Sequence, residues 1–320
     1  MDGTATEKER QGAEIMQFGA SVWPFQWEPP YEEALRRIVR LGFQAVELIA
    51  WDRDTLDTYY TPGRIAALRA LLDGDGLRLS EFVYTPPGLA SPDPARRQAA
   101  VEHFRRAADV AVALGTDTIN TVAPYPCDIA VPPLTTRPLA QTWTAAVPAG
   151  LDWAANWQHY VAVTQQLCAV CTERGLRYAL ESHPYRWVCG AVSLLRLMDH
   201  VESPALGVNL DPSHMFPMGD LPHIAAYHLA GRVWHTHVSD NDGTTNAHWR
   251  PGKGKIDWRA FLQALHATGY TGTLSIEVED VPGVARPGQS ATAAFEAENR
   301  VALAYLRTLC AEQGISLDER

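Results

Sequence analysis

The 320-residue sequence is poor in cysteine, with only five, an odd number. Disulfide-stabilised folds carry more cysteines in pairs, so we expect free thiols and a cytoplasmic protein. Cys168 and Cys171 form a C-x-x-C motif, but the motif lies inside a helical pattern, "VAVTQQLCAVCTERG". A zinc knuckle would need a second close pair, which the sequence lacks.

Long apolar runs are also missing. None approaches the ~20 residues that a membrane-spanning helix requires, so we expect no membrane association. Residues 1–16 are polar and contain no apolar signal core, and they are predicted to form a flexible tail before a single domain over residues 17–320.

Positive charge is scarce relative to negative charge. Lys and Arg total 27 against 37 Asp and Glu, which gives a formal charge of −10. Such a chain is a poor match for nucleic acid or anionic lipid, so neither is an expected partner. The segment after the first predicted strand, "WPFQWEPP", has no G-x-G-x-x-G motif, so no nucleotide cofactor is expected.

Short apolar runs alternate with amphipathic segments eight times. The predicted strands lie at 17–25, 45–51, 77–84, 117–124, 176–183, 205–211, 232–240 and 272–279. Strands that are apolar on both faces and separated by helices indicate a parallel sheet covered by helices. Eight such units predict closure into a (β/α)8 TIM barrel of α/β class, with an open doubly wound sheet as the alternative.

The connection after the fourth strand is unusually long, covering about residues 124–155 and rich in Pro, Thr and Trp. Structureless loops beyond ~15 residues are usually functional or disordered. The loop is expected to pack against something, either as a lid over the pocket or against a partner surface, because Trp143 and Trp153 lie within it and Trp157 lies shortly after it.

Metal-binding side chains end the last four strands. Glu181, Asp211, His237 and Glu277 each fall near the carboxyl end of a different strand. In a barrel these ends share one rim, so three carboxylates and an imidazole would converge there. This donor set suits Mn²⁺ or Mg²⁺, with Zn²⁺, Co²⁺ and Fe²⁺ also possible. Without a cation, carboxylates this close would repel one another.

Five stretches resemble the xylose isomerase-like barrel superfamily, namely "ALESH", "GVNLDPSH", "HTHVSDND", "RPGKGKIDW" and "GYTGTLSIEVED". That group includes sugar isomerases and 3-epimerases, inosose dehydratases and endonuclease IV. The resemblance implies that one divalent metal ion, expected to be Mn²⁺, is held by Glu181, Asp211, His237 and Glu277. It also implies that Glu181 and Glu277 move the substrate proton and that His214 contacts a substrate oxygen or supports the site.

The chemistry follows from a cation bound to neighbouring oxygens of a keto-sugar. Polarisation of the carbonyl acidifies the adjacent C–H, and a nearby base can then form an enediolate. Reprotonation gives isomerisation or epimerisation, whereas loss of a β-substituent gives elimination. We therefore expect a sugar isomerase or epimerase, with a lyase as the alternative and a non-catalytic binding subunit as a third.

The sequence departs from the sugar 3-epimerases at two positions. Gly243 stands where they have an arginine, and Trp187 stands where they have a glutamate. His183, two residues after Glu181, is a predicted additional acid or base, or else a residue that orients a ligand. His235 shares a strand face with His237 and is expected to be structural.

Further residues are predicted around the pocket. Arg186, Lys253 and Lys255 could contact substrate oxygens or be solvated. Aromatic residues at the ends of the first four strands are Trp23, Phe25, Trp27, Trp51, Tyr84 and Tyr125. Of these, Trp23, Trp51 and Tyr84 are predicted substrate contacts, because flat apolar faces suit a sugar or an attached aromatic ring.

The aromatic residues and the long loop suggest a ligand larger than a free monosaccharide. Family resemblance then implies a second possibility, the catalytic subunit of a C-glycoside deglycosidase acting on 3-oxo-glycosides beside a small β-rich partner. An inosose-type dehydratase is a further lyase possibility, and oligomers are common for such barrels.

Overall fold

The computed structural model describes residues 15–129, 147, 149–281, 283–284 and 292–318. Eight parallel strands close into a barrel in which each strand pairs with the next and β1 pairs with β8. The strands are β1 (Gln17–Ser21), β2 (Ala45–Ile49), β3 (Arg78–Val83), β4 (Thr118–Val122), β5 (Arg177–Glu181), β6 (Leu206–Leu210), β7 (Val233–Val238) and β8 (Thr273–Ile276). The predicted TIM barrel is confirmed.

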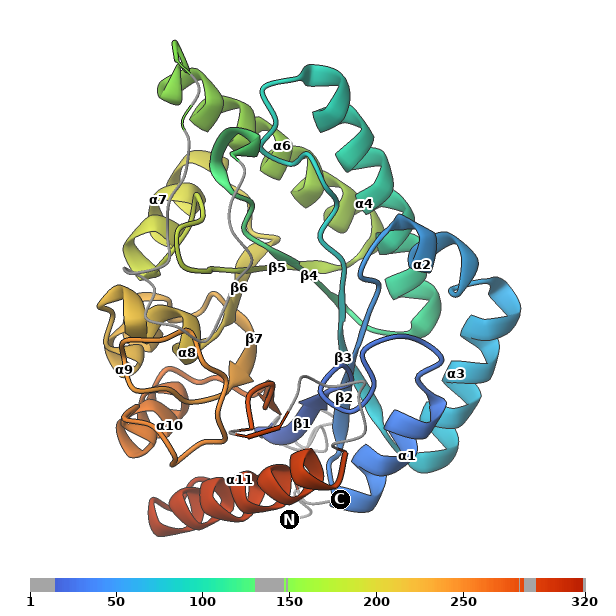
Figure 1. Ribbon diagram of the computed structural model, residues 1–320, viewed down its shortest axis with the longest axis vertical. Coiled ribbons are helices and arrows are strands. Elements are labelled where there is room, and N and C mark those ends of the chain that lie inside the picture. Colours follow the sequence, from blue (N-terminus) through green and yellow to red (C-terminus); the bar gives the residue numbers. More distant parts are fainter. Residues whose placement is uncertain (1–14, 130–146, 148, 282, 285–291, 319–320) are drawn as a thin grey trace, which may run out of the picture.

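Helices surround the strands on the outside (Figure 1). The longer ones are α1 (Glu32–Leu41), α3 (Pro62–Asp75), α4 (Pro94–Leu114), α6 (Trp153–Arg174), α7 (Ala191–Val201), α9 (Pro222–His228), α10 (Trp258–Ala267) and α11 (Thr292–Glu312). Short helical turns are α2 (Arg53–Thr58), η2 (Pro126–Asp128), α8 (Pro212–Met215) and η3 (Phe216–Met218). None of the described helices is long and apolar enough to cross a membrane.

Local sequence signals set the helix ends. At α3, the Thr61 side chain accepts a hydrogen bond from the Arg64 amide, and Pro62 occupies the first turn. Both features are typical of a helix N-terminus, because Pro lacks the amide hydrogen that would otherwise be unpaired there. Gly76 ends the helix with a φ of 65°, a left-handed conformation that glycine adopts without strain.

The core has an apolar and a polar part. Between the sheet and the helices lie buried residues such as Phe18, Leu48, Phe82, Leu180 and Val208. The barrel interior, by contrast, contains buried polar side chains, namely Ser21, Glu47, Glu81, Asn120, Asn209, His235, His237 and Ser275. TIM barrel interiors are usually filled by bulky aliphatic residues. The buried polar residues of this interior therefore indicate a functional role at this end of the barrel.

The long connection after β4 is described only at its two ends. Residues 1–14 of the predicted tail, and residues 130–146 with Trp143, lie outside the described residues. Trp157 is buried within α6, where its ring contacts Trp187 at a centroid distance of 5.6 Å. Trp153 is half exposed and lies 5.5 Å from the same ring. These two tryptophans therefore pack on the loop that follows β5.

Candidate metal centre and active site

The four predicted metal ligands converge at the carboxyl ends of β5 to β8. Each of Glu181, Asp211, His237 and Glu277 offers a ligand atom, and these atoms lie within 4.8 Å of one another. All four side chains are buried. Glu181 ends β5, Asp211 and Glu277 directly follow β6 and β8, and His237 lies within β7. The closed barrel thus brings together residues that span almost a hundred positions.

Two carboxylate oxygens in this group have no hydrogen-bond partner among the described residues. Asp211 uses Oδ1 to accept bonds from the amide and the hydroxyl of Ser213, at 2.7 and 2.6 Å. Glu277 uses Oε1 to accept a 2.9 Å bond from Trp23 Nε1. The other oxygens, Oδ2 of Asp211 and Oε2 of Glu277, are buried without a well-formed hydrogen bond, and histidine nitrogens approach them only to 3.3–3.5 Å. Buried anionic oxygens of this kind are costly unless a cation or a proton neutralises them, so the site fits a divalent metal.

His237 faces two groups of acids. Its Nδ1 lies 2.7 Å from Glu181 Oε1 and 3.3 Å from Glu277 Oε2. Its Nε2 lies 2.8 Å from Glu47 Oε2. Although burial alone would lower the pKa of His237, the carboxylates of Glu277, Glu47 and Glu181 raise it well above the usual value. In the absence of a cation, the imidazole therefore carries the positive charge that the acids require.

The pKa values of Glu181 and Glu277 move in opposite directions. Burial raises the pKa of Glu277 well above its usual value, despite the nearby His237 and His248. Burial also disfavours ionisation of Glu181, but His237 and His183 outweigh it and hold the Glu181 pKa well below the ordinary range. Without a cation, Glu277 and His237 thus hold protons at neutral pH, and a bound metal would have to replace them.

Three further histidines surround the four ligands. His183 Nε2 lies 3.4 Å from Glu181 Oε2, and the His183 and His214 rings have a centroid distance of 3.5 Å. His214 Nε2 and His248 Nε2 approach Asp211 Oδ2 to 3.4 and 3.5 Å. Burial lowers the pKa of His214 to about 3, so this ring is neutral. Hydrogen bonding to Asp211 and the charge of Glu277 outweigh burial and raise the pKa of His248 to about 10.

His248 was missed by sequence reasoning. It lies in the loop after β7, which folds back through an isolated bridge between Asp240 and Trp249. Because that fold-back depends on loop geometry, no strand pattern indicates it. His235 lies beneath the site, in agreement with the structural role expected for it, but Glu47 and Glu81 were also missed. Their signal was an acidic residue within each of two apolar strands, "AVELI" and "RLSEFV".

A cavity of about 210 Å³ opens beside the four ligands. One wall is polar, with Glu181, His183, His214, His237, Asn246, His248, Glu277, Glu279 and Asp280. The rest of the lining, which we call the apolar wall, consists of Trp23, Trp27, Ile49, Trp51, Val83 and Val122. The Trp27 and Trp51 rings stack at a centroid distance of 4.1 Å. A cavity of this kind suits a ligand with one polar face and one apolar face.

Several predicted substrate contacts lie elsewhere. Tyr84 and Arg186 are not among the described residues that line the cavity. Tyr84 is fully buried, and the Arg186 guanidinium stacks on Tyr125, with Cζ 3.5 Å from the ring centroid. Lys253 pairs with Glu298, with Nζ and Oε2 3.5 Å apart. The cavity geometry therefore supports Trp23, Trp51 and His214 as substrate contacts more directly than Tyr84 or Arg186.

Comparisons with known proteins agree with the barrel fold. Residues 35–302 match the sequence profile of the xylose isomerase-like TIM barrel family. D-psicose 3-epimerase of Ruminiclostridium cellulolyticum is 23% identical over 265 residues, covering 80% of this chain and 81% of that protein. The structure of D-psicose 3-epimerase with D-tagatose from Clostridium cellulolyticum H10 superposes with a TM-score of 0.73 at 21% identity, covering 92% and 99% of the two chains. That of 3-keto-D-glucoside 4-epimerase from E. coli gives 0.69 at 19% identity, covering 92% and 99%.

Proposed function

Because this chain belongs to the xylose isomerase-like TIM barrel family, we propose that it is a divalent-metal-dependent sugar epimerase or isomerase. It removes a proton from the carbon beside the carbonyl of a keto-sugar or sugar derivative. The observation that carries the proposal is the convergence of Glu181, Asp211, His237 and Glu277, whose ligand atoms lie within 4.8 Å of one another beside a cavity.

A divalent cation held by these four side chains would draw electrons from the carbonyl oxygen and acidify the neighbouring C–H. The metal we expect is Mn²⁺, with Mg²⁺, Co²⁺, Zn²⁺ and Fe²⁺ as alternatives, because oxygen donors dominate the set. The buried oxygens of Asp211 and Glu277 that lack a well-formed hydrogen bond support the presence of an ion.

Proton transfer is assigned to the two glutamates at the cavity wall. Glu181 on β5 and Glu277 after β8 both line the cavity, and both approach Nδ1 of His237. One carboxylate takes the proton from the carbon, leaving the electron pair delocalised into an enediolate, and the other carboxyl group returns a proton. Return to the opposite face inverts that carbon, so substrate and product contain the same atoms.

The histidines and tryptophans bind and orient the sugar. His214 and His183 line the cavity next to Glu181, so their ring nitrogens can contact sugar hydroxyls. His214 Nδ1 lies 2.8 Å from Asn246 Oδ1, which holds that ring in place and makes Nδ1 the protonated nitrogen. The apolar wall with Trp23 and Trp51 packs on sugar C–H faces and excludes water from the enediolate.

Metal exchange and solvent deuterium test this function. The protein is stripped with a chelator, reloaded with Mn²⁺, and incubated in D₂O with D-fructose, D-psicose, D-tagatose and a 3-keto-glucoside. Deuterium should enter the carbon beside the carbonyl only when the metal is present. A fully loaded protein that exchanges no hydrogen with any of these compounds would contradict the proposal.

A lyase is a second candidate, favoured by the apolar wall of Trp23, Trp27, Trp51, Ile49, Val83 and Val122. The aromatic and aliphatic side chains of this wall suit a glycoside with an apolar substituent. After the same proton abstraction, the bond to the β-substituent breaks, the substituent leaves with the electron pair and a proton, and an unsaturated ketone remains. Release of an aromatic aglycone from a 3-oxo-glycoside would identify this outcome. The small β-rich partner subunit, an oligomeric state and the inosose-type dehydratase stay predictions.

A further inference from the structure

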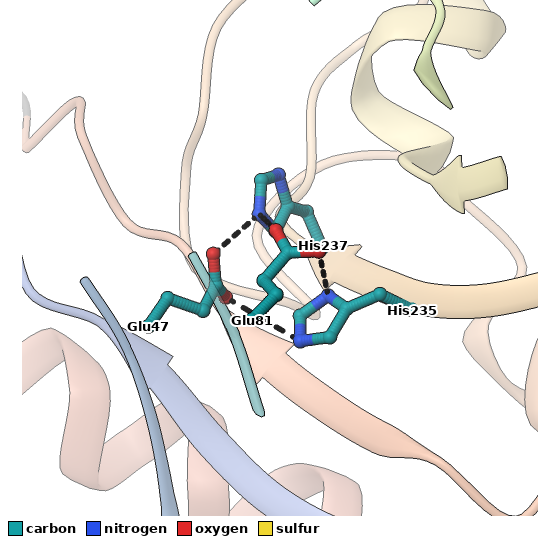
Figure 2. Close-up of side chains that lie close together, drawn as sticks. All are labelled: Glu47, Glu81, His235 and His237. Atoms are coloured by element: carbon teal, nitrogen blue, oxygen red, sulfur yellow. Dashed lines mark hydrogen bonds and ion pairs between the residues drawn. The ribbon is translucent and has the colours of Figure 1, made fainter. Parts of the chain in front are cut away.

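A second layer of ionisable side chains lies beneath the candidate metal centre. It consists of Glu47 on β2, Glu81 on β3, and His235 and His237 on β7. All four are at most 1% exposed. Figure 2 shows the two carboxylates placed between the two imidazole rings, so that each acid faces both rings. Burying four such groups is costly unless they are paired, and here each carboxylate lies within 4.0 Å of a nitrogen of both rings.

His237 belongs to both layers. Its Nδ1 faces Glu181 and Glu277 at 2.7 and 3.3 Å. Its Nε2 faces Glu47 Oε2 at 2.8 Å, the contact drawn in Figure 2. An ionised carboxylate only accepts hydrogen bonds, so the hydrogen in the contact with Glu47 belongs to Nε2. With Nε2 protonated, the neutral ring has its lone pair on Nδ1, which is the nitrogen directed at the candidate metal ligands.

Other neighbours of Nε2 do not set this protonation. Glu81 Oε1 lies 3.6 Å from Nε2, too far for a hydrogen bond, and accepts instead a 3.0 Å bond from Asn120 Nδ2. Asn209 also presents its amide nitrogen to Nε2, at 3.0 Å, and could donate only to a lone pair on Nε2. The contact with Glu47 is shorter, at 2.8 Å, and the ionised carboxylate can only accept, so Glu47 sets the hydrogen on Nε2. Glu47 is in addition held by the hydroxyl of Ser21, which donates to Oε1 at 3.2 Å.

We propose that Glu47 is a positioning residue that fixes the ring orientation and the tautomer of His237 so that Nδ1 is free to bind the metal. This inference rests on the metal site of the proposed function. Partners of metal-ligating histidines typically change metal affinity about 10- to 100-fold when they are lost. Glu47 touches neither the cavity nor the other three ligands among the described contacts, so its effect reaches the metal through His237 alone.

The same four side chains could instead hold a second ion, since their ligand atoms also lie within 4.8 Å of one another. The geometry favours positioning. A nitrogen that donates its hydrogen to Glu47 has no lone pair in the ring plane for a second cation. The two interpretations predict different stoichiometries, one bound ion in the first case and two in the second.

Two matched variants, E47Q and E81Q, test the inference. Each replaces one buried carboxyl group of the inner layer by an amide of almost the same volume, but of the two only Glu47 lies within hydrogen-bond distance of His237. Mn²⁺ affinity is measured by competition with a chelating dye. We expect the dissociation constant to rise about 10- to 100-fold in E47Q and less than about threefold in E81Q. Equal affinities in the two variants would overturn the inference.

A second measurement needs no variant. In wild-type protein labelled with ¹⁵N-histidine and loaded with Mg²⁺ or Zn²⁺, long-range ¹H–¹⁵N spectra identify which ring nitrogen carries hydrogen. We expect hydrogen on Nε2 of His237, and hydrogen on Nδ1 would overturn the inference even if E47Q does not fold. Two bound ions in wild type and one in E47Q would also overturn it. Wild-type protein that binds no divalent ion would contradict the proposed function, whereas binding that E47Q leaves unchanged contradicts only the role of Glu47.

Discussion

The indole Nε1 of Trp23 donates a 2.9 Å hydrogen bond to Oε1 of Glu277, across 254 positions of sequence. Trp23 follows β1 and Glu277 follows β8, the two strands that pair to close the barrel. The bond leaves Oε2 of Glu277 directed at His237 Nδ1, 3.3 Å away. An aromatic residue of the apolar wall therefore also orients one of the candidate metal ligands.

Replacement of Trp23 by phenylalanine tests this link. W23F keeps an aromatic ring in the wall but removes a hydrogen bond to a buried carboxyl group, which is worth about 1.5–3 kcal/mol when the acceptor is charged. We expect kcat to fall about tenfold or more. W27F is the control, because Trp27 lines the same cavity but stacks on Trp51. A similar loss of kcat in both variants would show that the aromatic lining, and not the hydrogen bond to Glu277, accounts for the effect of Trp23.

Metal binding should stabilise the folded protein through Asp211. Since an ion that binds only the native state adds about 2.7 kcal/mol at a hundredfold excess over Kd, Mn²⁺ should raise the Tm of the wild type. D211N removes the negative charge of a candidate ligand that is fully buried, and its Tm should not respond. E279Q changes another carboxylate of the cavity wall outside the four ligands and should respond like wild type. Thermal unfolding with and without Mn²⁺ measures all three.

Metal binding should also release protons. The pKa values of His237 and Glu277 are both raised well above their usual values in the cation-free protein. Both groups therefore hold protons at neutral pH that a cation must displace, so affinity should decrease as the pH falls, by about tenfold per unit for each proton released. Calorimetric titration of Mn²⁺ in buffers of different ionisation enthalpy counts these protons. If no proton were released on Mn²⁺ binding at pH 7, the expected coupling between metal binding and deprotonation of His237 and Glu277 would be contradicted.

The apolar wall should select the substrate. Trp51 stacks on Trp27, and its Nε1 donates a 2.6 Å bond to the Trp27 carbonyl oxygen. W51L removes the aromatic face while keeping an apolar residue. If the wall binds a substituent, W51L should raise KM for a keto-glycoside with an aromatic aglycone about tenfold, corresponding to roughly 1.4 kcal/mol, and change KM for a free ketose much less. Equal changes for both substrates would indicate that the wall contacts only the sugar ring.

The stability of the barrel should depend on Gly207 in β6. A Cβ there would lie 2.1 Å from Nε1 of Trp234, whose indole donates a 3.1 Å bond to the Ala205 carbonyl oxygen. G207A should therefore destabilise the protein by about 3 kcal/mol or more, because overpacking forces the ring from its place. G74A in α3 meets no atom within 4 Å and should instead stabilise by up to about 1 kcal/mol. Urea unfolding of both variants measures the difference.

Much of the candidate site could be predicted because the end of an apolar run in the sequence marks the end of a strand. Glu181, Asp211 and Glu277 each terminate or follow an apolar run, and parallel strands deliver such positions to one rim. Glu47 and Glu81 could not be placed in this way. Each lies within a strand, and only the closed barrel shows that β2 and β3 face β7 across the interior. The position of His248 depends on a loop that folds back over the site, which no strand pattern predicts. The burial of Tyr84 depends on how neighbouring side chains pack.

The contact between Glu47 and His237 joins residues 190 positions apart. Neither the first nor the second half of the chain contains both the nitrogen that faces the cation and the acid that sets its protonation. If the proposed site binds its ion with the help of Glu47, full affinity would arise only after β7 has joined β2, late in synthesis. Ion uptake would then report completed assembly of the barrel, and a truncated or misregistered chain would bind the ion weakly.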